Sequence, residues 1–387
     1  MNKQSFLPFA LPDIGDEEIS EVCDSLKSGW LTTGPKVKIF ENNFASWLGT
    51  DASSLAVSSA TAGLHLALEA CGISEGDEVI TTTHTFTATA SVIRYLGATP
   101  IIVDIDPSTM CISVDEVSKA ISEKTRAIIP VHFAGNAANM SDILSIARPR
   151  RIRVIEDAAH ALPTKYKGQL IGNLESDATV FSFYANKTIT TGEGGMVVTK
   201  DSSISNRIKT MRLHGISRDA FDRYTSKTPS WHYDVIAPGF KYNMTDISAA
   251  IGIHQLDKAF FFQEKRSEIA RLYNSKLQKL PLLLPYIPTD ENMHSWHLYV
   301  IRLKDGLNIS RNEVIDNLYK LGIGCGVHYI PLHNHPYWKE SLQLTNNMFP
   351  VSQSVYEKSI SLPIYSKMKQ SDALRVIEAL EKVFHNC

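Results

Sequence analysis

Cysteine is scarce in this sequence, and its spacing matches no common cysteine motif. The five cysteines are scattered along the chain, and none belongs to a C-x-x-C pair or to a spacing typical of metal ligands. Their odd number and their scatter indicate a reducing compartment, and a bound metal is not expected.

An excess of positive charge is also absent. Lys and Arg number 39 against 41 Asp and Glu, which gives a net charge of -2. No overall basic field is therefore present to hold nucleic acid or an anionic membrane, and an anionic ligand has to be bound locally. Residues 1–18 lack the apolar run of a signal peptide, and no later window approaches the roughly 18 uninterrupted apolar residues of a membrane helix. We expect a cytoplasmic protein that binds neither nucleic acid nor membrane.

The chain has 387 residues, of which 43% are hydrophobic, so it can form two or three domains with a sizeable core. From about residue 54 to 199, short β-rich runs alternate with runs of helical periodicity, and the β-rich runs are apolar on both faces. This alternation predicts an α/β fold with a mostly parallel sheet covered on both sides by helices. The predicted strands are residues 54–57, 77–80, 99–105, 127–133, 153–158, 179–183 and 195–199.

Helical patterns flank this region. Ile19, Val22 and Leu26 fall at i, i+3 and i+7 after Asp16, which predicts an amphipathic helix that ends at Gly29. A long helical pattern after residue 245 meets a proline-containing loop near residue 281. We place the domain boundary there, with residues 1–255 forming an N-terminal segment and a large domain, and 256–387 a small α+β domain. Its predicted elements are strand 296–303, helix 310–322, strand 324–330 and helix 371–384.

Two charged residues lie at or just after the ends of predicted strands. Asp157 closes one buried strand and Lys187 comes just after another, where α/β sheets commonly place active sites. A lysine taken alone is more often a solvated surface charge. Lys187, however, precedes a loop containing Gly192, Gly194 and Gly195, whose glycines suit positive φ or a close backbone approach.

These strings, taken with others, resemble the DegT/DnrJ/EryC1/StrS family of sugar aminotransferases, which are pyridoxal-phosphate (PLP) enzymes. The resemblance spans nearly the whole chain and implies an aspartate-aminotransferase-like fold (PLP fold type I), with a mostly parallel seven-stranded sheet and a smaller C-terminal α+β domain. The matching strings are residues 28–41, 58–68, 76–90, 128–140, 155–172, 181–196, 239–252 and 322–333.

The resemblance implies a role for both charged residues. Lys187 matches the catalytic lysine that holds the cofactor and then moves protons at the substrate carbon. Members with histidine at this position resemble dehydratases, so the lysine favours amination. Asp157 matches the carboxylate that keeps the pyridine nitrogen protonated, although a cap after the strand is the alternative. His160 matches a contact on the O3′ side of the cofactor, or it is a buried structural histidine.

Other cofactor contacts follow from the same resemblance. Thr61 and Ala62 open a helix and, with Ser182, would bind the phosphate, although Thr61 is also suited to an N-cap. Phe86 matches the aromatic residue that stacks on the pyridine ring, and a core position is the alternative. Asn243 matches an asparagine that reaches the phosphate in the neighbouring subunit, which implies a homodimer with shared active sites.

The residues that bind the substrate are less specified. Cations are needed for the diphosphate of a nucleotide sugar, although a basic run such as residues 212–223 is usually a solvated face. His328 and His333 match a family region near the sugar site but are equally suited to structural roles. Their spacing does not indicate a metal site. The candidates are Trp30, Thr33, Arg212, His214, Arg218, Arg223, His328 and His333.

The resemblance implies transfer of an amino group from L-glutamate to the C4 keto group of a UDP-linked 4-keto sugar. A 4-keto-6-deoxy-N-acetylhexosamine is the first expectation and a 4-keto pentose the second, for the synthesis of a surface polysaccharide such as lipopolysaccharide. A 3-keto-sugar aminotransferase, a PLP-dependent sugar dehydratase and a non-catalytic regulatory protein on the same scaffold stay open as alternatives.

Overall fold

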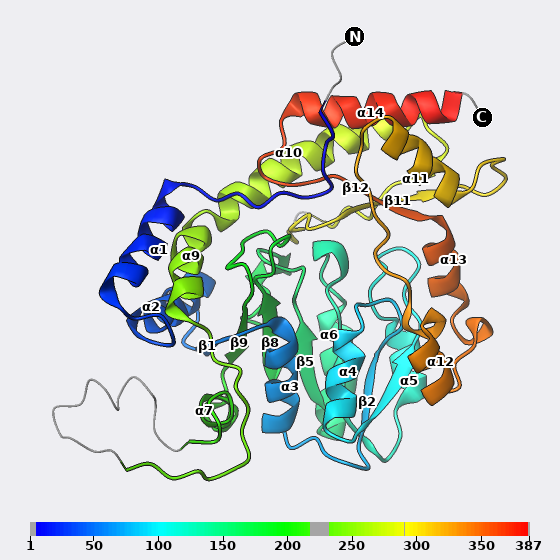
Figure 1. The fold of residues 1–387 in the computed structure, drawn as a ribbon. Coiled ribbons are helices and arrows are strands. Elements are labelled where there is room, and N and C mark those ends of the chain that lie inside the picture. Colours follow the sequence, from blue (N-terminus) through cyan, green and yellow to red (C-terminus); the bar gives the residue numbers. More distant parts are fainter. Residues whose placement is uncertain (1–4, 217–231, 290, 386–387) are drawn as a thin grey trace.

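A seven-stranded sheet forms the centre of the computed structural model, which describes residues 5–216, 232–289 and 291–385 (Figure 1). The strand order is β1-β9-β8-β5-β4-β2-β3. Neighbouring strands are parallel except at β9, which runs antiparallel to both β1 and β8. The predicted mostly parallel sheet is therefore confirmed. Its strands are β1 (Ser53–Val57), β2 (Glu78–Thr82), β3 (Thr99–Val103), β4 (Thr125–Ile129), β5 (Arg153–Asp157), β8 (Ala178–Ser182) and β9 (Gly195–Thr199).

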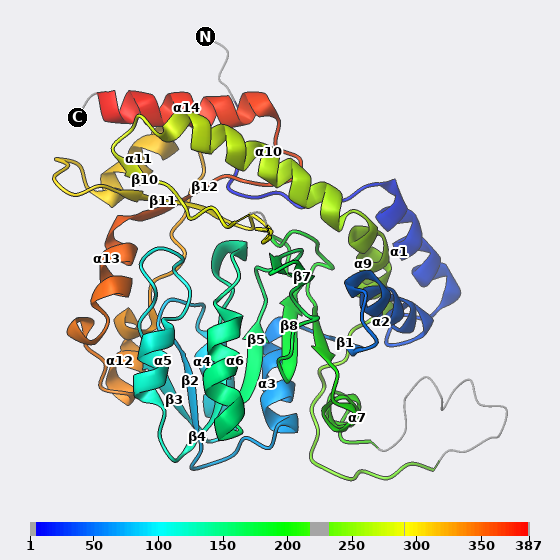
Figure 2. The same cartoon turned by 180° about the vertical axis from the view of Figure 1, so that it is seen from behind.

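Helices cover both faces of this sheet because its strands are apolar on both sides. Successive side chains point to opposite faces, so Val79 packs into one core cluster and Ile80 into the other. One face is covered by α3 (Ala60–Ala70), α4 (Ala88–Tyr95) and α7 (Ser202–Met211). The opposite face, seen in Figure 2, is covered by α2 (Pro35–Leu48), α5 (Val114–Ala120) and α6 (Met140–Ala147).

The first helix, α1 (Asp16–Ser28), forms where it was predicted, but the predicted buried face was wrong. Ile19 and Leu26 are each 55% exposed, whereas Glu18 is fully buried against α9 (Asp246–Asp257). The Glu18 carboxylate accepts hydrogen bonds from Lys258 at 2.8 Å and Gln255 at 2.9 Å. This ion pair holds Glu18 in the interior, and the periodicity of the sequence does not reveal it.

The C-terminal part of the chain builds a second core around a three-stranded antiparallel sheet. Leu7 belongs to this core as well, and its backbone pairs with Gly322 and Gly324. The helices of this part are α10 (Ala259–Leu277), α11 (Arg311–Lys320), α12 (Pro336–Ser341), α13 (Pro350–Lys358) and α14 (Gln370–His385), and its strands are β10 (Leu282–Leu283), β11 (Tyr299–Leu303) and β12 (Ser359–Leu362). The domain boundary at residue 255 stays a prediction, next to the change from α9 to α10.

The predicted strand 324–330 was wrong. This segment makes one isolated bridge, between Gly326 and Ser361, and then leaves the small sheet. The departure follows from Tyr329, whose hydroxyl is bonded to His160 of the large domain. The segment therefore brings its side chains to the carboxyl edge of the large sheet.

No helix in the described part of the chain is long and apolar enough to cross a membrane.

Candidate active site

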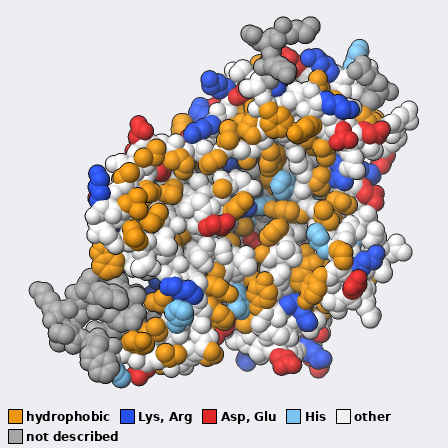
Figure 3. Space-filling model, viewed as in Figure 1, with side chains coloured by type: hydrophobic (Ala, Val, Ile, Leu, Met, Phe, Trp, Pro, Cys, Tyr) orange, Lys and Arg blue, Asp and Glu red, His pale blue; other side chains and the backbone are white. Residues whose placement is uncertain are grey.

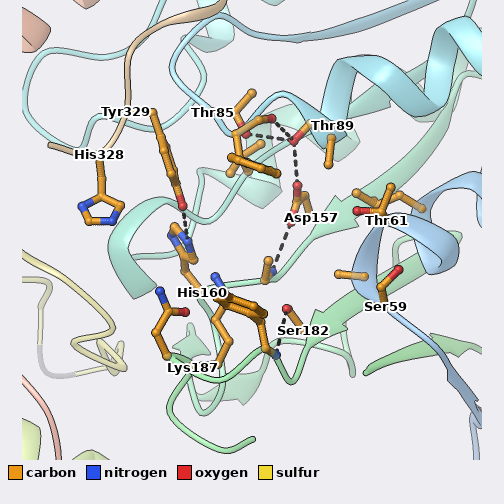
Figure 4. Close-up of a pocket in the computed structure, with 18 of the residues that line it drawn as sticks. Ser59, Thr61, Thr85, Thr89, Asp157, His160, Ser182, Lys187, His328 and Tyr329 are labelled. Carbon is orange, nitrogen blue, oxygen red and sulfur yellow. Dashed lines mark hydrogen bonds between the residues drawn. The ribbon is translucent and has the colours of Figure 1, made fainter. Parts of the chain in front are cut away.

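A cavity of about 450 Å³ lies at the carboxyl ends of β5 and β8, beside the start of α3 (Figure 4). Parallel strands direct their carboxyl ends to one edge of a sheet, and loops leave that edge free to form a site. The cavity brings together most of the cofactor-binding candidates from the sequence, which are Thr61, Phe86, Asp157, His160, Ser182 and Lys187.

Asp157 is the last residue of β5 and is 6% exposed. One carboxylate oxygen accepts a hydrogen bond from the Thr89 hydroxyl at 2.9 Å, and the other from the Ala159 N–H at 3.1 Å. Burial raises the pKa of this carboxyl above its ordinary value, against the opposing effect of these bonds. A cationic N–H that entered the cavity at this end would restore the charged form.

Lys187 lies on the loop between β8 and β9 and projects into the same cavity. Burial lowers the pKa of its amine from 10.5 to about 8, and the nearby negative charge of Asp157 opposes part of this effect. About a tenth of such amines are neutral at pH 7, against about 0.03% at the ordinary pKa. Only the neutral amine adds to a carbonyl, so the fold prepares this lysine as a nucleophile.

His160 lines the same cavity as these two charged residues and lies below Tyr329 in Figure 4. Its Nδ1 accepts the backbone N–H of Ala134 at 3.2 Å, and its Nε2 lies 2.8 Å from the Tyr329 hydroxyl. Burial, together with the charge of Lys187, holds the pKa of His160 well below its ordinary value. The ring is therefore neutral.

The start of α3 is suited to an anionic group. Ser59 is the N-cap, and its hydroxyl accepts the Ala62 N–H at 3.1 Å, so this amide is already used. No hydrogen bond from the Ala60 or Thr61 N–H is found within residues 5–216, 232–289 and 291–385. Free N–H groups at a helix N-terminus bind phosphate well. The close approach of β9 needs Gly195, since a Cβ there would lie 2.8 Å from the Ala60 nitrogen.

These groups fit pyridoxal phosphate. A buried carboxylate at one end would hold the ring nitrogen, and the helix start with the Ser182 hydroxyl would hold the phosphate. Phe86 is 58% exposed despite its apolar ring and lines the cavity, where a flat ligand ring would cover it. Within the described ranges, no three His, Cys, Asp or Glu side chains gather as metal ligands.

The structure places several substrate candidates outside this cavity. Arg212 is buried, and its guanidinium donates to Glu41 at 2.5 Å and to the Ala56 carbonyl at 2.8 Å, which satisfies the free edge of β1. His333 is fully buried and hydrogen-bonded to Thr83 at 2.7 Å. Both side chains are therefore committed to structural contacts. His328 does line the cavity.

Asn243 and Thr33 lie together at a second cavity, which Arg212 also lines. The Asn243 amide donates to the Thr33 hydroxyl at 2.6 Å, so this asparagine does not reach the first cavity of its own chain. The backbone N–H of Trp30 bonds to a Ser28 hydroxyl at 3.2 Å. His214 is exposed, and its backbone N–H donates to the Phe240 carbonyl. Arg218 and Arg223 lie outside the described residues.

Sequence reasoning missed several residues that shape the cavity, among them Ser59, Thr89 and Tyr329. Thr89 lies in the first turn of α4, and its hydroxyl is 2.8 Å from the Thr85 hydroxyl and donates to Asp157. Tyr329 follows His328 directly, inside a string that the sequence had already singled out.

Comparison with known proteins agrees with this geometry. The profile of the DegT/DnrJ/EryC1/StrS aminotransferase family matches residues 12–381. The chain belongs to this family. The spore coat polysaccharide biosynthesis protein SpsC of Bacillus subtilis is 44% identical over 383 residues, which are 98% of each chain.

Solved structures support the same assignment. The PLP form of the putative sugar aminotransferase Spr1654 from Streptococcus pneumoniae has a TM-score of 0.90 and 34% identity, over 98% of this chain and 99% of that one. PseC of Helicobacter pylori, an aminotransferase of pseudoaminic acid biosynthesis, has a TM-score of 0.91 and 28% identity, over 99% and 100%. The family and these neighbours are PLP-dependent sugar aminotransferases, and this is the enzyme class of the DegT/DnrJ/EryC1/StrS family member described here.

Proposed function

We propose that this aminotransferase moves the amino group of L-glutamate to the C4 keto group of a UDP-linked 4-keto sugar used in surface polysaccharide synthesis. A 2-acetamido-4-keto-6-deoxyhexose is the first candidate and a 4-keto pentose the second. The supporting observation is that a partly neutral amine, on Lys187, shares one cavity with a buried carboxylate, on Asp157. The roles of SpsC in polysaccharide synthesis and of PseC in pseudoaminic acid synthesis favour this substrate class.

When bound, the cofactor supplies an electron-accepting ring that stabilises negative charge at the carbon that gains or loses the amine. Asp157 holds the proton on the ring nitrogen. The Lys187 Nζ would take a proton from the carbon that loses the amine and would give a proton to the carbon that gains it. His160 would lie beside the bound ring, with its Nε2 already bonded to Tyr329, and Phe86 would cover one ring face. Together these side chains would hold the ring against a wall that includes the buried Asp157 and His160.

The described part of one chain brings few positive charges to this cavity. Among the described residues that line the cavity, Lys187 is the only lysine or arginine. A diphosphate and the carboxylates of glutamate both need cationic or N–H partners. We therefore propose a homodimer in which each chain completes the other's site through Asn243. The exposed Ile19 and Leu26, and the many hydrophobic side chains on the face in Figure 3, favour a partner surface. The cytoplasmic location stays a prediction.

The substrate is tested with a panel of sugars. The purified enzyme is incubated with L-glutamate and UDP- or dTDP-linked 3-keto and 4-keto sugars, and products are identified by mass. We expect amination of a UDP-linked 4-keto sugar with ping-pong kinetics, and no product from Lys187→Ala. Turnover of 3-keto sugars alone would overturn the C4 assignment, and loss of water without amination would favour a dehydratase.

The shared site is tested with mixed dimers. Chains carrying Lys187→Ala are mixed with chains carrying Asn243→Asp, whose carboxylate would repel the phosphate. If Asn243 acts across the interface, each hybrid dimer has one intact site, and random exchange restores roughly a quarter of wild-type activity. If it acted within its own chain, every hybrid site would carry one lesion. No recovery after demonstrated subunit exchange would therefore reject the shared site.

A further inference from the structure

The hydrogen positions at His160 follow from its neighbours. A backbone N–H is only a donor, so the Ala134 N–H at 3.2 Å requires a lone pair on the His160 Nδ1. The single hydrogen of the neutral ring is then on Nε2. The Nε2–H points at the Tyr329 oxygen, 2.8 Å away, and donates to it.

This assignment decides what Tyr329 does with its own hydrogen. The phenol oxygen accepts from His160, so its O–H is not used in that contact. The reverse polarity would place a hydrogen on Nδ1, facing the Ala134 N–H, and two donors would then oppose each other. Burial raises the pKa of the Tyr329 phenol, so the hydroxyl keeps its hydrogen throughout the neutral range.

The ring of Tyr329 is held in place on several sides. It lies at 24° to the His160 ring, with 5.9 Å between the ring centroids. Its centroid is 6.0 Å from that of the Phe86 ring and 6.5 Å from that of the Phe133 ring. Tyr329 and Lys187 line the same cavity, and the Tyr329 hydroxyl points toward His160, which lines it as well (Figure 4). A fixed ring and an unused O–H make a directed donor rather than a flexible one.

We propose that Tyr329 donates its hydroxyl hydrogen to an acceptor oxygen of the bound molecule, as the last member of a chain that runs from the Ala134 N–H through His160. The acceptor is the hydroxyl oxygen attached to the cofactor ring or an oxygen of the sugar, and both present the same chemistry. This inference rests on the proposed function for the sugar, but not for the cofactor. Tyr329 favours an acceptor at this point of the cavity, because its oxygen already accepts the His160 Nε2–H and its O–H is unused.

The first test uses the cofactor-free protein. Nitrogen-15 NMR of histidine-labelled chains, with the His160 signal identified by its loss in His160→Gln, should show an unprotonated Nδ1 and a protonated Nε2. The Nε2–H signal should shift in Tyr329→Phe. A hydrogen on Nδ1 would overturn the proposal and leave the proposed function standing, since this measurement needs neither cofactor nor sugar.

The second test locates the acceptor. Tyr329→Phe removes only the hydroxyl, and the loss of one hydrogen bond weakens binding by about 3- to 100-fold, more when the acceptor is charged. A cofactor oxygen is identified by weaker PLP binding in a Lys187→Ala background. A sugar oxygen is identified by a raised KM for the keto sugar with unchanged PLP binding. If neither value changes, the proposal is wrong.

The matched control is Tyr166→Phe. Tyr166 also has a phenol in two hydrogen bonds, since it donates to Asn139 at 2.9 Å and accepts the Ser141 N–H at 3.2 Å, but it lies outside the cavity. Its loss should leave PLP binding and KM unchanged. An equal effect of both substitutions would indicate a general structural disturbance and would contradict a directed donor.

Discussion

Lys187 should destabilise the cofactor-free protein, and the structure gives the size of the effect. The change in the amine pKa from 10.5 to about 8 on folding corresponds to about 3 kcal/mol. Lys187→Met removes the buried charge, so the free energy of unfolding should rise by up to about 3 kcal/mol at pH 7. This value is an upper limit, because the substitution also removes the favourable effect of the lysine on Asp157.

The pH dependence gives the sharper test. Below about pH 8 the amine is protonated in both states, and the folded state carries the full cost. Between about pH 8 and 10.5 only the folded state releases the proton, so wild-type stability rises with pH. The advantage of Lys187→Met should therefore shrink across this window and vanish above it.

Urea unfolding of cofactor-free protein, followed by circular dichroism at one protomer concentration, measures this difference. Lys119→Met is the control, because the Lys119 side chain is 71% exposed and should give no gain at neutral pH. An advantage of Lys187→Met that stays constant from pH 7 to 11 would refute the reasoning, since a gain from better packing alone has no such dependence on pH. No gain at pH 7 would refute it as well.

Three further predictions follow from single contacts. Asp157→Asn should lower turnover by about 100-fold or more in enzyme whose cofactor content is checked by absorbance, because no carboxylate then holds the ring proton; near-normal turnover would contradict its role. Arg212→Met should lower the free energy of unfolding by about 3 kcal/mol, because the Glu41 carboxylate, 14% exposed, loses its cationic partner, and a Glu41→Gln, Arg212→Met double variant should recover part of this loss in urea unfolding. Asp246→Ala should lower it by about 1 to 3 kcal/mol, since the Asp246 carboxylate accepts three backbone N–H groups at the start of α2, and Asp246→Asn should cost less.

The sheet was predictable from the sequence because its strands are buried on both sides. Each strand is a short apolar run between turn residues, and this pattern depends on neighbours in the sequence. The orientation of α1 was not predictable, because it depends on the ion pair between Glu18 and Lys258, about 240 positions away. The segment 324–330 has the residue types of a strand but is drawn away by one tertiary contact, at Tyr329.

The candidate site also contains some residues that the sequence could predict and others that it could not. Lys187 and Asp157 were singled out because Asp157 ends one buried strand and Lys187 lies shortly after another, at the edge of the sheet, and the family resemblance then indicated their roles. Arg212 and His333 belong to equally suggestive strings, yet their side chains are satisfied by Glu41 and Thr83, which lie far away in sequence. A local motif identifies the type of residue, whereas distant partners decide whether its side chain stays available.

The pairing of Leu7 with the small domain has a consequence for biosynthesis. Its N–H bonds to the Gly322 carbonyl at 2.9 Å, and its carbonyl accepts the Gly324 N–H at 2.8 Å. A ribosome makes the chain from the N-terminus, and domains generally fold as they emerge. The segment around Leu7 is therefore made before its partners and must wait, unpaired, until residue 324 has left the ribosome. The small core can close only when most of the protein has been synthesised.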